Sequence, residues 1–428
     1  MVIEELELAF DKQVSNVHKG LEKLPFNINF VPEALGDKRW TEELILATWQ
    51  QALTGLPPKN GLEYKIGRSN GGFDRLDFKI NNEKSLSGET PIDLSIPLNG
   101  RSRGPKITIP IPIYGGGMSF GSVSLNFMLS RAIAAKKLNI FFSTGEGGYP
   151  SPLVEYKDQI ITQIATGLFG VNEQTMQYAP ILEFKYAQGA KPGLGGHLLA
   201  DKVTSEVAKM RESVSFSSLY SPFPFHSVYS VEDHKKHVDW AKTVSPNALI
   251  SVKVSTPKDV DMVAIGSYYA GANIIHIDGG FGGTGAAPEI AKKNIAMPIE
   301  YAIPKVHKFL LSEGVRDEII LMASGGIRTA YDVAKAIALG ADGCVTGTAE
   351  TIAVGCTHCG NCEKGRGCQI GITTTDPYLS NFIDPNWGAN RIINLFSSWK
   401  IQWEELLRKL GLQSIKELRG RTDLLKYV

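Results

Sequence analysis

The sequence has few cysteines, almost no net charge and no long apolar run. Its 428 residues include 45 basic and 44 acidic side chains, which leaves a formal net charge of +1. This balance provides no basic surface for nucleic acid or for an anionic membrane. The longest apolar runs fall short of the roughly 18 residues that span a bilayer. The acidic start, MVIEELELAFDKQ, also lacks the basic and apolar regions of a signal peptide. We therefore expect a cytoplasmic protein that binds neither nucleic acid nor membrane.

Five cysteines are too few for a secreted disulfide scaffold, and four of them lie in one short segment. Cys356, Cys359, Cys362 and Cys368 follow the pattern C-x2-C-x2-C-x5-C. Such spacing lets successive thiolates converge on one centre, which is an iron–sulfur cluster or, less often, zinc. The remaining cysteine, Cys344, lies inside an apolar run and is expected to be a small core residue.

Eight short apolar runs alternate with helical segments in the middle of the chain. They are residues 107–114, 140–143, 160–165, 181–186, 249–254, 274–277, 319–323 and 343–346. Apolar strands that alternate with helices form parallel sheets covered on both faces. We predict an α/β fold in which eight βα units close into a (β/α)8 (TIM) barrel. A doubly wound open sheet is the structural alternative.

Three regions differ in composition. Residues 1–104 are predicted to form an N-terminal extension packed on the barrel, with a helix over 42–56 that Pro57 and Pro58 stop. Residues 105–385 are predicted to form the barrel, including the cysteine segment at 356–368. Residues 386–428 are predicted to form C-terminal helices outside it.

Glycine-rich motifs begin where most of the apolar runs stop, and in a βα barrel these points share the rim that carries the active site. The run GGGMSFGS, which contains Gly117, Met118 and Ser119, would let the backbone approach a flat ligand such as a flavin. Loops after the sixth, seventh and eighth runs are of the type that binds phosphate at a barrel rim. Their candidate residues are Gly283, Ser324, Gly325, Gly326, Gly347 and Thr348. FMN fits this arrangement, although each loop alone is also compatible with a tight turn.

Several polar side chains near the same rim are candidates for chemistry. Lys191 could bind a substrate carboxylate and Glu146 could handle protons or an amino group, while His197 ends the Lys191 loop. Each of these is also compatible with a solvated or structural side chain. Lys253 lies in the apolar run ISVKV, where an anion must offset its charge. That anion is either the electron-rich edge of a reduced flavin or a carboxylate in the core.

Together, these motifs resemble the FMN-binding synthase domain of glutamate synthase over roughly residues 105–385. The matching segments are GGMSFGSVS, STGEGG, AQGAKPGLGGHL, SPFPFHSVYSVED, ISVKV, IDGGFGGTGAAP, SGGIRTAYDVAKAIALGADG and GTA. The resemblance implies an FMN and iron–sulfur oxidoreductase that passes electrons through the cluster to FMN and converts 2-oxoglutarate and ammonia to glutamate. It would place Gly117, Met118, Ser119, Gln163 and Lys253 around the flavin ring, and Gly325, Gly326, Gly347 and Thr348 at its phosphate. Lys191 and Glu146 would meet the 2-oxo acid.

The chain departs from the family pattern at four points. It begins Met1-Val2, without a near-terminal nucleophilic cysteine, so we expect ammonia from a glutaminase-type partner subunit, free ammonia or an amine. His197 stands where the family has glutamine, and Tyr149 where an acidic residue is common. The fourth departure is the cysteine pattern, which favours a 4Fe–4S cluster and leaves a 3Fe–4S cluster possible.

These departures leave alternatives at the substrate end. One is glutamate formation from 2-oxoglutarate; another is an N-methylglutamate synthase-type subunit that converts glutamate and methylamine. Electrons are expected from ferredoxin or a reductase subunit, within an oligomer or complex. A non-catalytic electron-transfer or scaffold subunit, and a zinc-containing barrel without flavin, are the alternatives from other classes.

Overall fold

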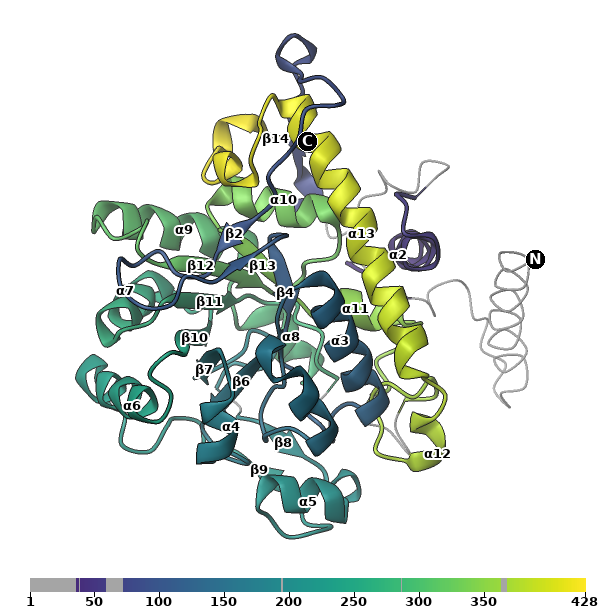
Figure 1. The fold of residues 1–428 in the computed structure, drawn as a ribbon, viewed down its shortest axis with the longest axis vertical. Helices are drawn as coiled ribbons and strands as arrows, with labels where there is room; N and C mark the ends of the chain where they lie inside the picture. The colour runs from purple at the N-terminus through teal and green to yellow at the C-terminus, as the bar shows by residue number, and fades with distance from the viewer. Residues whose placement is uncertain (1–35, 38, 59–71, 194, 286, 363–367) are drawn as a thin grey trace. The chain divides into compact units, whose positions relative to one another are not determined.

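The computed structural model describes residues 36–37, 39–58, 72–193, 195–285, 287–362 and 368–428. Among these residues, eight parallel strands close into one barrel, in the order β10-β11-β12-β13-β4-β5-β6-β7 (Figure 1). The strands are β4 (Ile113–Gly115), β5 (Phe142–Ser143), β6 (Ile160–Ala165), β7 (Ile181–Lys185), β10 (Leu249–Ser255), β11 (Ile274–Asp278), β12 (Ile320–Ser324) and β13 (Gly343–Thr346). The ring closes where β10 pairs with β7. The predicted barrel is confirmed, and the open sheet is excluded.

Helices follow most of the strands along the chain. They are α3 (Leu125–Leu138), α4 (Glu173–Gln177), α5 (Ser205–Arg211), α6 (Val231–Val244), α7 (Val260–Ala270), α8 (Glu289–Asn294), α9 (Ile299–Ser312), α10 (Ala330–Leu339) and α11 (Thr348–Ala353). Hydroxyl side chains begin three of the longer helices, because Ser124, Ser230 and Thr329 accept hydrogen bonds from otherwise unpaired N–H groups in the first turn. The starts of these three helices are thus defined by single capping residues.

The longest helix, α13 (Pro385–Leu410), lies against α3 and against α2 (Glu42–Thr54) of the extension (Figure 1). It buries Trp399 and Trp403, and the indole N–H of Trp403 donates a 2.7 Å hydrogen bond to the Ala330 carbonyl. The remaining short elements are α12 (Pro377–Ser380) and the 3-10 helices η3 (Gly72–Arg75), η4 (Asn82–Lys84), η5 (Ser151–Gln159), η6 (Ala200–Lys202), η7 (Ile415–Leu418) and η8 (Thr422–Leu424).

Outside the barrel, the described residues form three two-stranded sheets. They pair β1 (Leu76–Phe78) with β14 (Leu425–Tyr427), β2 (Ile96–Pro97) with β3 (Thr108–Ile109), and β8 (His197–Leu198) with β9 (Leu219–Tyr220), all antiparallel. The β1–β14 pair joins the extension to the C-terminal end of the described chain.

The predicted first strand, residues 107–114, is wrong in its extent. Pro110 and Pro112 have no N–H to donate to a strand ladder, so the run is split into β3, which is outside the barrel, and β4, which is inside it. The predicted helix over 42–56 is confirmed in shortened form as α2. It ends at Gly55, whose φ of 72° is left-handed.

Residues 36–428 form one compact unit. The proposed divisions at residues 104 and 385 stay predictions, and residues 1–35 and 59–71 of the expected extension lie outside the described residues. No helix in the described part of the chain has both the length and the apolar character that a membrane crossing requires.

Candidate functional site

The loops that were predicted to bind phosphate meet at the rim of the barrel. Gly325 and Gly326 follow β12 with φ values of 96° and 81°, a left-handed conformation that side chains disfavour. A Cβ on Gly325 would lie 2.4 Å from the carbonyl oxygen of Gly279, in the loop after β11. A Cβ on Gly283 would lie 1.9 Å from Oγ1 of Thr348, at the start of α11. The structure thus brings together the loops that follow β11, β12 and β13.

The loop after β4 lies beside them. Cε of Met118 is 3.8 Å from the position of a Cβ on Gly347, and a Cβ on Gly117 would lie 3.1 Å from Nε2 of Gln163 on β6. Ser119 accepts a 3.0 Å hydrogen bond from the guanidinium of Arg211 on α5. Of the residues predicted for the flavin ring, Gly117, Met118, Ser119 and Gln163 therefore belong to one neighbourhood, while Lys253 lies on β10.

A buried arginine, Arg131, makes polar contacts that stabilise the loop after β4. Arg131 on α3 forms a 2.6 Å ion pair with Glu350 on α11 and donates hydrogen bonds to the carbonyls of Gly116 and Ser143. Glu350 also accepts a 2.6 Å hydrogen bond from Thr346 at the end of β13. One ion pair thus joins three strand ends, which holds the rim loops in a fixed arrangement.

A charged network lies within the barrel at Glu183 of β7, a residue that the sequence analysis missed. Glu183 is 1% exposed and accepts hydrogen bonds from Gln163 (2.8 Å) and Ser251 (3.1 Å), while Nδ1 of His276 lies 3.0 Å away. Burial by itself would raise the pKa of Glu183. The hydrogen bond and charge of His276 and the charge of Lys253 outweigh it and lower the pKa to about 2. Glu183 is therefore an ionised carboxylate in the core.

The network continues to Lys253 through a relay of short contacts. Nε2 of His276 lies 2.7 Å from Oγ of Ser324, and this hydroxyl donates a 2.6 Å hydrogen bond to Asp278. Asp278 also accepts from the Gly189 N–H at 2.9 Å and lies 3.6 Å from Nζ of Lys253. Burial opposes ionisation of Asp278, but Lys253 and His276 lower its pKa.

His276 bridges Glu183 and Ser324 through its two ring nitrogens, and the Ser324 hydroxyl in turn donates a hydrogen bond to Asp278. The sequence left open whether a flavin edge or a core carboxylate offsets the charge of Lys253, and the structure places the carboxylate of Asp278 beside it.

A pocket at the mouth of the barrel contains the predicted substrate residues Glu146 and Lys191. The pocket encloses about 300 Å³ of space, its open mouth included, and Lys185 at the end of β7 also lines it. Nζ of Lys185 lies 3.6 Å from Glu146, and Ser221 donates a hydrogen bond to the same carboxylate. Burial lowers the pKa of Lys185, and the charge of Glu146 partly offsets this effect. Nδ1 of His197 lies 3.2 Å from Nζ of Lys191.

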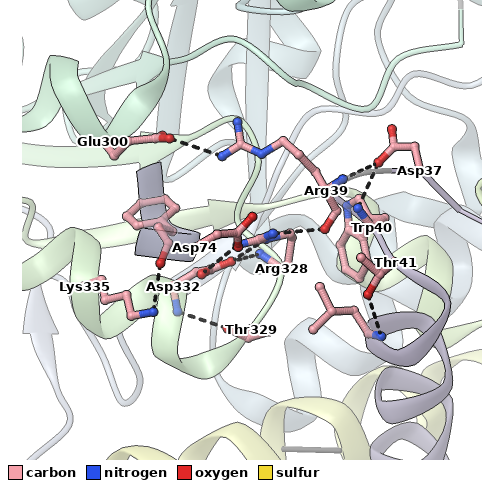
Figure 2. Close-up of polar contacts among 12 residues, drawn as sticks. Asp37, Arg39, Trp40, Thr41, Asp74, Glu300, Arg328, Thr329, Asp332 and Lys335 are labelled. Carbon is pink, nitrogen blue, oxygen red and sulfur yellow. Dashed lines mark hydrogen bonds and ion pairs between the residues drawn. The ribbon is translucent and has the colours of Figure 1, made fainter. Parts of the chain in front are cut away.

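The arginine of the SGGIRT motif, Arg328, is bound by residues of the extension and of α10. Arg328 donates to Asp74 of η3 at 2.6 Å, to Asp332 of α10 at 2.8 Å and to the backbone carbonyl of Arg39 at 2.9 Å (Figure 2). Burial opposes its charge, but both carboxylates raise its pKa above the ordinary value. Arg328 therefore anchors the extension to the barrel.

The cysteine segment lies against the loop after β11. A Cβ on Gly285 would lie 2.3 Å from the Cβ of Cys362. Burial, together with the nearby Cys368 and Cys362, raises the pKa of the Cys356 thiol to about 12. Within the described residues, no group of three or more Cys, His, Asp or Glu side chains is arranged to hold a metal ion. The four-cysteine ligand set stays a prediction; Cys344, as expected, is buried in β13.

A family model described as a conserved region in glutamate synthase matches residues 69–413. The chain belongs to the glutamate synthase family. It is 44% identical over 331 residues to the archaeal glutamate synthase (NADPH) of Methanocaldococcus jannaschii, an alignment that covers 76% of this chain and 64% of that protein. It is 41% identical over 355 residues to the archaeal-type glutamate synthase (NADPH) of Thermotoga neapolitana, covering 83% of this chain and 68% of that protein.

This member of the family thus spans about two thirds of the length of these relatives. Among solved structures, a lactate oxidase of Pediococcus acidilactici is similar in fold, with a TM-score of 0.52 and 14% identity over 92% of this chain and 97% of that one. The likeness supports the barrel fold.

Proposed function

We propose that this chain binds FMN at the barrel rim and catalyses the reductive amination of 2-oxoglutarate to glutamate. The observation that carries the proposal is the pocket in which Glu146, Lys185 and Lys191 converge beside the rim loops. Membership of the glutamate synthase family and the relatives' printed names support the same reaction class.

The rim residues fit FMN. Side chains at positions 117, 325 and 326 would crowd neighbouring protein atoms, and Gly325 and Gly326 have left-handed φ values, so the backbone is open to close approach at these points. Gly117, Met118, Ser119, Gln163 and Lys253 would surround the ring, and Gly283, Ser324, Gly325, Gly326, Gly347 and Thr348 would lie at the ribityl phosphate. When bound, FMN supplies hydride transfer.

The pocket side chains suit a dicarboxylate substrate that carries an imine. Lys185 and Lys191 provide two cationic centres for carboxylates, and Glu146 provides a carboxylate that can hold an ammonium ion or accept its proton. The ion pair between Lys185 and Glu146 holds both groups on the same wall. Lys253 supplies a positive charge at the base of the site, where a negative flavin edge would need it.

His197 favours a second candidate for the amine. Because its imidazole lies 3.2 Å from Lys191, where the family has glutamine, it changes the donors that face the substrate. An N-methylglutamate synthase-type exchange of methylamine onto glutamate is therefore the alternative reaction.

We also propose that Cys356, Cys359, Cys362 and Cys368 hold an iron–sulfur cluster, with 4Fe–4S favoured by four thiolates. Ferredoxin or a reductase subunit is the proposed electron donor, and a glutaminase-type subunit the proposed ammonia source. The spacing of the cysteines and their position against the loop after β11 support the cluster. Iron and sulfide content should fall in Cys362→Ala and stay unchanged in Cys344→Ala, the matched control; equal content in both variants would contradict the assignment.

An anaerobic reoxidation screen tests the reaction. The FMN-loaded protein is reduced, mixed with 2-oxoglutarate plus ammonia or with other 2-oxo acids, and followed by flavin absorbance. We expect reoxidation with 2-oxoglutarate and ammonia, much slower turnover in Lys191→Gln, and no change in Lys136→Gln, whose lysine is exposed. Formation of N-methylglutamate and ammonia from glutamate and methylamine by the protein with oxidised FMN, without turnover of 2-oxoglutarate and ammonia, would favour the second candidate. Reoxidation by no 2-oxo acid and amine, together with no such exchange, would favour an electron-transfer or scaffold subunit.

A further inference from the structure

Arg39 brings a guanidinium from outside the barrel to the loop after β12. It lies just before α2, yet its side chain is buried, with 6% of the residue exposed. Cζ of Arg39 is 3.2 Å from the position of a Cβ on Gly326, so the guanidinium lies over this glycine. It also stacks on Phe281 of the loop after β11, 4.0 Å from the ring centroid. Arg39 thus contacts two of the three loops that gather at the rim.

The hydrogen-bonding capacity of this guanidinium is largely unused within the described residues. One NH2 group donates to Glu300 of α9 at 3.3 Å, while Nε of Arg39 and Oε2 of Glu300 are buried without a hydrogen-bond partner (Figure 2). Buried N–H groups are normally paired, because a buried donor has lost its hydrogen bonds to water and is destabilising unless a protein or ligand acceptor replaces them. The structure therefore leaves a donor available beside a glycine loop.

The neighbouring arginine shows the opposite pattern. Every nitrogen of Arg328 donates to Asp74, Asp332 or the Arg39 carbonyl, and Figure 2 shows its guanidinium enclosed by these groups. Four of the five N–H groups of Arg328 are thus bonded within the protein. Of these two arginines, Arg39 is the one with a buried nitrogen that has no hydrogen-bond partner.

We propose that Arg39 binds the phosphate of FMN, so that a residue of the N-terminal extension completes the phosphate site that the barrel loops begin. This inference rests on the proposed FMN binding. Glu300 orients the guanidinium, and Asp37 fixes the backbone by accepting hydrogen bonds from the N–H groups of Arg39 and Trp40 at 2.8 and 2.9 Å. A bidentate guanidinium suits a dianionic phosphate better than neutral N–H groups alone.

The comparison of FMN with riboflavin, which lacks the phosphate, isolates this contact. The full chain, freed of flavin, is titrated with each ligand, and the quenching of flavin fluorescence gives Kd. In Arg39→Ala we expect FMN binding to weaken roughly 10- to 100-fold, the range for a lost charge-assisted hydrogen bond, with riboflavin binding unchanged. Arg39→Lys should recover part of the lost affinity, because lysine restores the positive charge but not the paired N–H donors of the guanidinium.

Arg101→Ala is the matched control. Arg101 also stacks on an aromatic ring, 4.1 Å from the centroid of Tyr268, and donates to backbone carbonyls of Ala272 and Tyr268 away from the rim. Its loss should leave both Kd values unchanged. The proposal would be overturned if the ratio of the Kd for FMN to the Kd for riboflavin in Arg39→Ala stayed within twofold of the wild-type ratio, which includes the case in which both flavins bind equally more weakly. A wild-type chain that binds neither flavin would instead refute the proposed function, and the role of Arg39 with it.

Discussion

Replacement of Glu183 by glutamine tests the charged network in the barrel. The change keeps the size of the side chain and removes a carboxylate that is 1% exposed and bound by Gln163, Ser251 and His276. Its pKa falls from 4.5 to about 2 in the folded protein. At 1.36 kcal/mol per pKa unit, this corresponds to about 3 kcal/mol of stability at neutral pH.

The pH dependence has a defined sign. Because the folded pKa is below the unfolded one, the contribution is complete above pH 4.5 and is lost as pH falls through about 2. We expect Glu183→Gln to be less stable than the wild type by about 3 kcal/mol at pH 7 and by about 2 kcal/mol at pH 3.5. Spread over roughly 400 residues, the first value lowers Tm by about 4 °C.

Urea unfolding at several pH values measures this difference. Glu155→Gln is the matched control, because Glu155 is 71% exposed in a 3.6 Å ion pair and should contribute less than about 1 kcal/mol. A cost below about 1 kcal/mol for Glu183→Gln at pH 7, or a cost that grows as the pH falls, would refute the network.

Two further substitutions test the anchoring of the extension and the base of the site. Arg328→Ala leaves Asp74 and Asp332 buried without their cation and should destabilise the protein by about 3–5 kcal/mol in urea unfolding. The control, Arg421→Ala, removes an exposed ion pair and should cost about 1 kcal/mol or less. Equal costs for the two variants would contradict the anchoring role of Arg328. Lys253→Ala should lower FMN retention after gel filtration or slow flavin reduction, whereas Lys136→Ala should change neither; wild-type behaviour of Lys253→Ala in both assays would count against its place beside the flavin.

The barrel was predictable because its signal is local and repeated. Each buried strand is a short apolar run, and helical segments separate most of them, so all eight strands fell within or next to the expected ranges. The error at residues 107–114 has an equally local cause in Pro110 and Pro112, which should have been taken to interrupt the strand.

The site was predictable only where glycine motifs marked the strand ends. Glu183 and His276 were missed because each is a single ionisable residue inside an apolar run, and only their pairing reveals the network. An ionisable residue within a buried strand was noted at Lys253, and the same signal was present at these two positions. Arg39 carried no such signal, since its partner Glu300 is 261 residues away.

Product analysis after a single turnover tests the proposed reaction most directly. The reduced, FMN-loaded chain is mixed anaerobically with 2-oxoglutarate and nitrogen-15 ammonium, and the products are measured by mass spectrometry. We predict one nitrogen-15 glutamate for each FMN reoxidised. Reoxidation without labelled glutamate, or no reoxidation at all, would contradict reductive amination by this chain.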